Sequence, residues 1–406
     1  MSLLGPVSTL RRHRDAAFEA DFLAGAPPAG MNFSRPAAAS YWDSAGVHRV
    51  AASNEPRFDF DPISLRPRGL LLEPASTNYF TWSNDFTVSA WTFAGATRTP
   101  GFAAPNGKPE AVVFTGTSNG PSMRSWTIPR AGRAAFSVYV NPMGNTQTRP
   151  FLIRNGTTAT NLSQGIFDPA TGTIATSVGA GEWRAERLPN GWWRISASAN
   201  AAFAVGDTAV FYFGFTTGSI SNMPAMACWG GQAELGNVTT SLIPTTNVAA
   251  ARSVDSAIFG AWWYDAAVGG TLLADFTPGP LQEGTGLSPR IAVLDNGSTA
   301  NRAGIYLANS ANVAQSIAVV DGTGLYNRSS AFIAAASGAN LVAFAFGQEG
   351  GSSRINGALL GADITSPILP NGISRLEISP ASGRPFHIRG VRYYKSRKDL
   401  AQITAR

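Results

Sequence analysis

Histidine, the side chain most often used in acid–base catalysis, occurs three times in this chain of 406 residues, at positions 13, 48 and 387. A Ser–His–Asp hydrolase would therefore have to use His48 or His387. The run 385–388 around His387 is typical of a strand, where a structural histidine is more common than a catalytic one. No two histidines stand at the spacing of a zinc site, and the glycine-rich stretch 347–351 lacks the lysine of a phosphate-binding loop.

The carboxylates of Asp and Glu are the remaining side chains that could act as catalytic groups. A glycosidase needs only two of them, about 5–9.5 Å apart on one cleft, and strands far apart in the chain can supply such a pair. Acidic residues number only 25 and mostly lie at turn positions, where capping and solvation explain them. The candidates, none with a distinguishing context, are Asp265, Asp275, Glu283 and Glu377. We predict a protein that is not an enzyme, with a polysaccharide depolymerase as an alternative.

The ten tryptophans are the strongest indication of a ligand. Sugar rings have apolar C–H faces that stack on an exposed indole. Most of the indoles must nevertheless lie in a core, and we expect Trp91 and Trp229 there. Trp126 and Trp183 are the candidates for exposed indoles that contact sugar. Packing between domains is an equally favoured role for both.

The neighbouring pair Trp192 and Trp193 cannot both point inward on a strand, because adjacent side chains alternate between the two faces. Trp193 shares a face with Ile195 and is predicted to be the buried one. Trp192 would then be exposed beside Arg194. An indole next to a planar guanidinium fork suits an acidic sugar, so the predicted ligand contacts are Trp126, Trp183, Trp192 and Arg194.

The length and composition restrict the fold classes that this chain can adopt. The length fits two domains plus a smaller terminal segment. Charged residues make up only 14%, and the Gly, Ser, Thr, Asn and Pro that replace them suit short strands joined by turns. The net charge is +6, but the arginines are scattered outside one cluster at 11–14, so no nucleic-acid partner is predicted. One cysteine, Cys228, excludes an intrachain disulfide and suggests a buried, inert thiol.

The N-terminal residues do not resemble a signal peptide, because the basic cluster is followed by Asp15 and Glu19 rather than by an apolar core. No apolar run approaches the ~20 residues that span a bilayer. We therefore expect synthesis in the cytoplasm, no membrane insertion, and release by a route such as cell lysis.

The order of the elements follows from the patterning. Residues 7–25 carry a helical pattern, and 31–75 are turn-rich with aromatic residues that must pack on another domain or subunit. Strand-like runs begin near 76, with turn cues every dozen residues or so. In one run, Phe136, Val138 and Val140 alternate onto one face, which indicates a half-buried antiparallel strand. The boundary near 244–256 opens a second β-rich block, and 398–406 is predicted to be a short helix.

A resemblance to bacteriophage tail and minor structural proteins rests on three motifs. The first is Phe33, Arg35, Ala39, Tyr41 and Asp43; the second is 56–59; the third is 69–73, followed by Thr77 and Asn78. Downstream, 82–86, 191–194 and 229–236 are similar to carbohydrate-binding modules of jelly-roll form. The last block, 255–406, more loosely resembles concanavalin A or laminin-G-like domains through 390–394.

The resemblance completes the expected architecture: an all-β chain of two antiparallel β-sandwiches after a partly helical attachment segment. The segment is 1–75, the jelly-roll module 76–252, and the lectin-like sandwich 253–406. It implies a homotrimeric fibre or spike on the virion surface that binds host polysaccharide and contacts other virion proteins through 1–75. A purely structural virion part is the alternative. No cofactor is expected; structural calcium stays open, with no ligands assigned.

Overall fold

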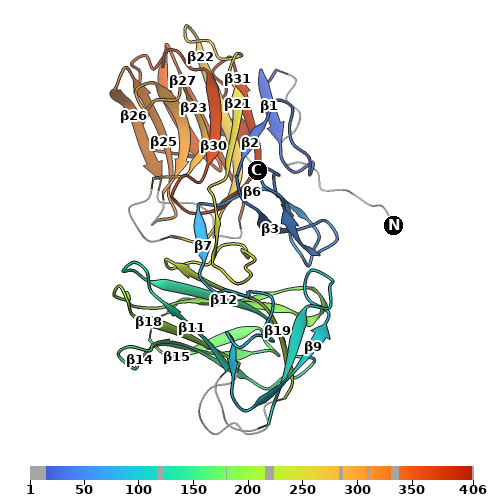
Figure 1. Ribbon diagram of the computed structural model, residues 1–406. Helices are drawn as coiled ribbons and strands as arrows, with labels where there is room; N and C mark the ends of the chain where they lie inside the picture. The colour runs from blue at the N-terminus through green and yellow to red at the C-terminus, as the bar shows by residue number, and fades with distance from the viewer. Residues whose placement is uncertain are drawn as a thin grey trace.

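The structure is a computed structural model that describes residues 15–117, 122–179, 181–214, 224–282, 287–308, 311–330 and 338–404. Antiparallel strands account for nearly all of its regular structure, as the composition predicts. The terminal helix expected at 398–406 is present as α1 (Leu400–Thr404). Figure 1 shows two β-sandwiches, one above the other, with strand β7 between them.

The middle part of the chain forms one sandwich around a shared apolar core. Its first sheet has the order β16 (Trp183–Arg187), β17 (Trp193–Ser198), β12 (Ala134–Asn141), β19 (Met226–Leu235), β10 (Ala111–Gly116) and β9 (Ala96–Phe102). The second has the order β15 (Thr173–Val178), β14 (Thr160–Asp168), β13 (Arg149–Asn155), β18 (Thr208–Phe213), β11 (Ser122–Thr127) and β8 (Thr92–Phe93).

The other sandwich combines the two ends of the chain. One sheet has the order β29 (Ala358–Leu359), β28 (Gly350–Ile355), β27 (Asn340–Gly347), β22 (Gly269–Pro278), β31 (Phe386–Tyr394), β6 (Pro67–Leu72) and β5 (Phe58–Phe60), and β1 (Phe18–Asp21) also pairs with β31. The facing sheet has the order β2 (Asn32–Ser34), β21 (Ser256–Gly260), β30 (Arg375–Ser379), β23 (Arg290–Asp295), β24 (Arg302–Leu307), β25 (Ala314–Val320) and β26 (Thr323–Ser330).

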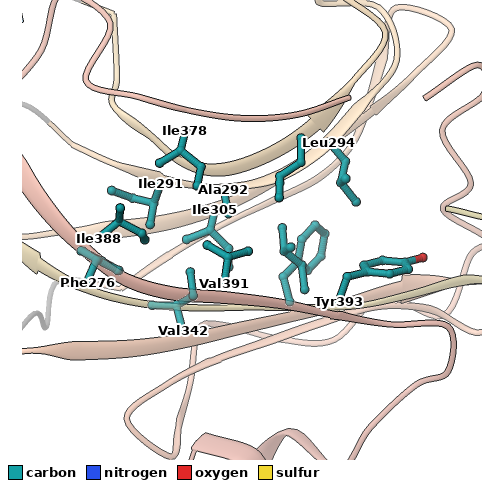
Figure 2. Close-up of a cluster of buried hydrophobic side chains, with 14 of the residues drawn as sticks. Phe276, Ile291, Ala292, Leu294, Ile305, Val342, Ile378, Ile388, Val391 and Tyr393 are labelled. Carbon is teal, nitrogen blue, oxygen red and sulfur yellow. The ribbon is translucent and has the colours of Figure 1, made fainter. Parts of the chain in front are cut away.

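The core of this sandwich is filled from both sheets. Figure 2 shows Phe276 and Val342 from one sheet facing Ile291, Ile305 and Ile378 from the other. All five are fully buried. Burial of a side chain of this size is worth about 1.5–3 kcal/mol, so these interdigitating faces stabilise the pairing of strands that are far apart in the sequence.

The N-terminal part therefore differs from the attachment segment that the sequence suggested. Its strands β1, β2, β5 and β6 belong to the sandwich built by the C-terminal residues, and they appear in blue against it in Figure 1. The helix expected over 7–25 is wrong where it can be tested, because Phe18–Asp21 form β1; residues 1–14 lie outside the described residues. The open edge of β31 offers backbone partners to this segment, and tertiary pairing overrides the local helical pattern.

The middle sandwich is inserted into the other one through two adjacent linkers. Strand β7 (Ser76–Asn78) leads into it, strand β20 (Ala250–Arg252) leads out, and the two pair with each other in antiparallel fashion. The chain thus enters and leaves the insertion at the same place.

A buried ion network holds this junction together. The Arg57 guanidinium lies 2.6 Å from both Glu73 and Asp255, while Arg35 lies 3.3 Å from Asp255 and Arg252 lies 3.0 Å from Glu73. Burial alone would raise the pKa of Glu73, but Arg252 and Arg57 outweigh it and hold that pKa well below its usual range. The arginines and the glutamate of the phage-like motifs thus have partners inside this chain.

The hairpin of β3 (Ala39–Trp42) and β4 (His48–Ala51) is a wedge between the two sandwiches. Trp42 and His48 pack with Tyr139 and Trp229 on the outer face of the middle sandwich. Strand β12 is consequently buried on both faces, since Phe136 lies in the core on its other side. The strand is antiparallel as predicted, but the half-buried state expected for it is wrong because the hairpin covers its outer face.

Candidate functional site

A groove lies where the hairpin and both sandwiches meet. It consists of two adjoining cavities, of about 360 and 210 Å³, that share Glu186, Arg194, Thr239 and Pro280 in their walls. Together they reach the size of small-molecule binding sites, about 300–1,000 Å³. The middle sandwich supplies one wall, and strands β5, β6 and β31 of the other sandwich supply the opposite wall.

One corner of the groove is an aspartate–histidine pair on β5 and β31, the two strands that flank β6. His387 Nε2 lies 2.9 Å from Asp59 Oδ2, and the other oxygen of Asp59 accepts a hydrogen bond from the backbone N–H of Trp42 at 2.8 Å. Gly69, which lies beside Asp59 in the β5–β6 register, allows this approach. Its φ is +105°, and a Cβ there would stand 2.2 Å from the carbonyl oxygen of Ile388.

Arg68 connects this corner to the middle sandwich. Its guanidinium lies 2.9 Å from Asp61, 3.6 Å from Asp59 and 3.8 Å from Glu186. Burial lowers the pKa of Arg68, but Asp59 and Glu186 outweigh burial, and the pKa is raised overall. The three carboxylates thus surround one permanent positive charge.

Among the residues that the structure describes, Arg194 has no carboxylate partner, in contrast to Arg68 and Arg184. Its guanidinium donates to the Ser137 hydroxyl at 3.0 Å and to the Thr240 carbonyl, and it lies over the Tyr139 ring at 5.6 Å. Its buried Nε has no hydrogen-bond partner within the described ranges. Glu186 stands opposite Arg194 in the β16–β17 register, yet in the described part of the chain Arg194 forms no ion pair. An anion in the groove would accept hydrogen bonds from the remaining donors of this guanidinium.

The tryptophans at 192 and 193 follow the predicted alternation but not the predicted exposure. Trp193 faces the core with Ile195 but is half-buried rather than buried as predicted, and Trp192 points the other way. Trp192 is nevertheless only 2% exposed, and its indole N–H donates to the Ala103 carbonyl at 3.2 Å. The expected exposed pair of Trp192 with Arg194 is therefore wrong, because the outer face of this sheet is covered by the wedge hairpin and by the segment that follows β9.

Trp126 and Trp183 are both half-buried at the margin of the middle core. Trp126 stacks on Tyr79 with 4.5 Å between ring centroids, and the Trp183 indole N–H donates to the Ser163 hydroxyl at 2.8 Å. Neither lines the groove, so the structure brings only Arg194 of the four predicted contacts to it. The two expected core residues, Trp91 and Trp229, are confirmed at 1% exposure each.

Apart from His387, which was interpreted as a structural histidine, the groove's other charged residues were not singled out from the sequence. Asp59 lies in one of the phage-like motifs, but nothing in the sequence places His387, Arg68 and Glu186 beside it, since they come from β31, β6 and β16. This proximity depends on which strands pair across the whole chain.

The carboxylates considered for glycoside hydrolysis do not gather in the groove. Asp275 pairs with Arg389 at 3.4 Å, and Glu377 lies 2.5 Å from Arg290. Asp265 shapes a turn through the Ala267 N–H, and residue 283 lies outside the described residues.

Neither a nucleophile elbow nor a metal cluster is found among the described residues. A Gly-x-Ser-x-Gly sequence occurs at 116–120, of which 118–120 lie outside the described residues. The next element is strand β11 rather than the helix that a nucleophile elbow requires. Within the described ranges no three His, Cys, Asp or Glu side chains are grouped to hold a metal ion, and no helix has the length and apolar character to cross a membrane.

No family model matches the chain, and no curated protein matches it. Among solved structures, the carbohydrate-binding module CBM40 of the Ruminococcus gnavus IT-sialidase is similar at 15% identity over 35% of this chain and 85% of that one, with a TM-score of 0.29. The CBM22 tandem domain of Paenibacillus barcinonensis Xyn10C is similar at 11% identity over 79% and 98%, with a TM-score of 0.26.

Trypanosoma rangeli sialidase is similar at 11% identity over 77% of this chain and 62% of its own, with a TM-score of 0.30. TM-scores this low do not identify a ligand for this chain. The nature of a ligand has to be inferred from the geometry of the groove.

Proposed function

We propose that this protein is a fibre or spike of a bacteriophage particle that holds an acidic sugar of the host surface in the groove between its sandwiches, without covalent chemistry. The observation that carries the proposal is the unmatched guanidinium of Arg194, which lines both cavities of the groove.

The acidic character of the ligand follows from the charge balance of the groove. Arg68 is matched by Asp59, Asp61 and Glu186, and Arg184 is matched by Glu182 at 3.1 Å. Arg194 is left with neutral partners, so a carboxylate of the ligand would form a charge-assisted pair with it. His387 and Thr239 nearby can hydrogen-bond the hydroxyl groups of a sugar ring.

The virion location is supported by the phage-like motifs within 32–250. Strands β1, β2, β5 and β6 are occupied in sheets of this chain. We therefore assign the contact with other virion proteins to the outward side of the N-terminal segment and to residues 1–14. A homotrimer is part of the proposal, as for the fibres that the sequence resembles.

Binding of purified protein to acidic and neutral host oligosaccharides, measured by calorimetry, tests the proposal. Arg194→Met keeps the aliphatic stem over Tyr139 and removes the charge. We expect at least about tenfold weaker binding of acidic glycans, since a hydrogen bond to a charged group contributes about 1.5–3 kcal/mol. Arg184→Met is the matched control, because its charge lies on the same wall but is already paired with Glu182.

Two results would overturn the proposal. If neither acidic glycans nor host cells bind the protein, a purely structural role in the particle takes its place. If sugar is released from host polysaccharide during the same assay, the protein is a depolymerase, and Glu186 and Asp59 become the carboxylates to replace.

A further inference from the structure

A second pocket lies on the middle sandwich, away from the groove. It has a volume of about 450 Å³ and is lined by the loop after β7, the outer strands β9 and β10, and the linker that follows β19. Its walls include Trp82, Asn84, Asp85, Thr87 and Glu110. It shares no residue with the groove described above.

Trp82 is held in a backbone conformation that its residue type disfavours. Its φ is +57°, in the left-handed region that favours glycine. Three hydrogen bonds fix it there: its N–H donates to the Thr246 carbonyl at 2.6 Å, and its carbonyl accepts from the Trp91 indole N–H at 2.9 Å and from the Asp85 N–H at 3.2 Å. Strain of this kind concentrates at ligand-binding sites, and here it fixes the indole at the pocket wall.

The indole itself is left without partners. Trp82 is half-buried, and in the ranges that the structure describes no aromatic ring packs against it and its indole N–H has no acceptor. This sets it apart from Trp126, whose ring is stacked on Tyr79. An indole with a solvent-facing side at a pocket wall can stack on the apolar face of a sugar ring.

The polar side chains around the indole can form further hydrogen bonds. Asp85 uses one carboxylate oxygen for the N–H and hydroxyl of Thr87, and its other oxygen accepts no hydrogen bond from the described residues. The Asn84 side chain accepts a hydrogen bond from the Ser83 hydroxyl at 3.3 Å, and its NH₂ group donates to no described residue. Glu110 accepts a hydrogen bond from the Asn106 amide at 2.8 Å and pairs with Lys108 at 3.7 Å. No arginine, lysine or histidine is among the residues that line this pocket.

We propose that this pocket is a second binding site, for one uncharged sugar ring of a neutral glycan, with the ring stacked on Trp82 and its hydroxyls bound by Asp85 and Asn84. The carboxylate of Asp85 disfavours an anionic ligand, in contrast to the cation of the groove. The site extends the proposed glycan-binding function but does not depend on the groove.

The test is calorimetric titration with neutral hexose oligosaccharides that bind on a glycan array, using wild-type protein and four variants. Trp82→Gly relieves the left-handed strain while removing the indole, so this variant should keep the wild-type melting temperature or exceed it. It should lose neutral-sugar binding by at least about tenfold. Asp85→Asn should weaken binding and leave Trp82 in place.

Trp262→Ala is the matched control. Trp262 is 87% exposed on the other sandwich and lines none of the pockets described above, so its removal should leave neutral-sugar binding unchanged. Arg194→Met should also leave neutral-sugar binding unchanged. A failure of this proposal can therefore be distinguished from a failure of the proposal for the groove. Absence of any neutral glycan that binds, or binding that survives Trp82→Gly intact, overturns the proposal.

Discussion

His48 provides a direct test of how the wedge hairpin is packed. Its imidazole is fully buried, and burial first, then the nearby charge of Arg194, lowers the pKa from 6.5 to about 3. It makes edge contacts with Trp42, Tyr139 and Trp229. Folded protein therefore keeps His48 neutral at pH values where the unfolded chain binds a proton.

The difference in His48 pKa between the folded and unfolded states sets the sign and size of the pH dependence of the free energy of unfolding. Between pH 6.5 and 3 the unfolded state carries one more proton at His48, so stability is highest above pH 6.5 and falls as the pH drops. At pH 5 the difference corresponds to about 1.5 pKa units, or about 2 kcal/mol. His48→Phe, which keeps a ring in the aromatic cluster, should abolish this contribution.

The assay is urea unfolding, followed by tryptophan fluorescence, of wild-type protein and His48→Phe at pH 7 and pH 5. His13 and His387 are present in both proteins, so their contributions cancel in the difference. We expect the wild type to lose about 2 kcal/mol more than the variant. Equal losses, or an NMR titration that places the His48 pKa near 6.5, would refute the reasoning.

Three further predictions concern stability and reactivity. Arg57→Ala should cost roughly 3–5 kcal/mol in urea unfolding, because it leaves Glu73 and Asp255 buried without the guanidinium they share; a cost under about 1 kcal/mol would contradict the network. Trp91→Ala should cost about 3–5 kcal/mol, since a fully buried indole leaves a cavity, and an unchanged melting temperature would count against it. Burial raises the pKa of the Cys228 thiol, so iodoacetamide should label it only after unfolding; labelling of the folded protein would show that the thiol is accessible.

The sequence indicated the all-β class because the alternation of apolar residues along a strand is a local property. Phe136, Val138 and Val140 do face one core. Trp91 and Trp229 were placed correctly for the same kind of reason, since large apolar residues in strand-like runs are usually buried.

What the sequence could not provide was the pairing across the chain. A local pattern assigned Phe18 to a helix, whereas the structure pairs it with Tyr393. The exposure of Trp192 was misjudged because it depends on a hairpin more than a hundred residues away. The groove was missed for the same reason, and the Trp82 pocket because a left-handed tryptophan leaves no signal in composition or spacing.

The insertion of one sandwich into the other sets an order of events on the ribosome. Glu19 and Arg392, which pair across β1 and β31, are 373 residues apart. At ~5–20 residues per second, β1 waits on the order of 20–75 s for its partner. The inserted sandwich has all its strands once β20 has emerged, so it can fold during that interval. A nascent chain would then carry a folded inserted sandwich while the unpaired strands at its start still need protection from aggregation.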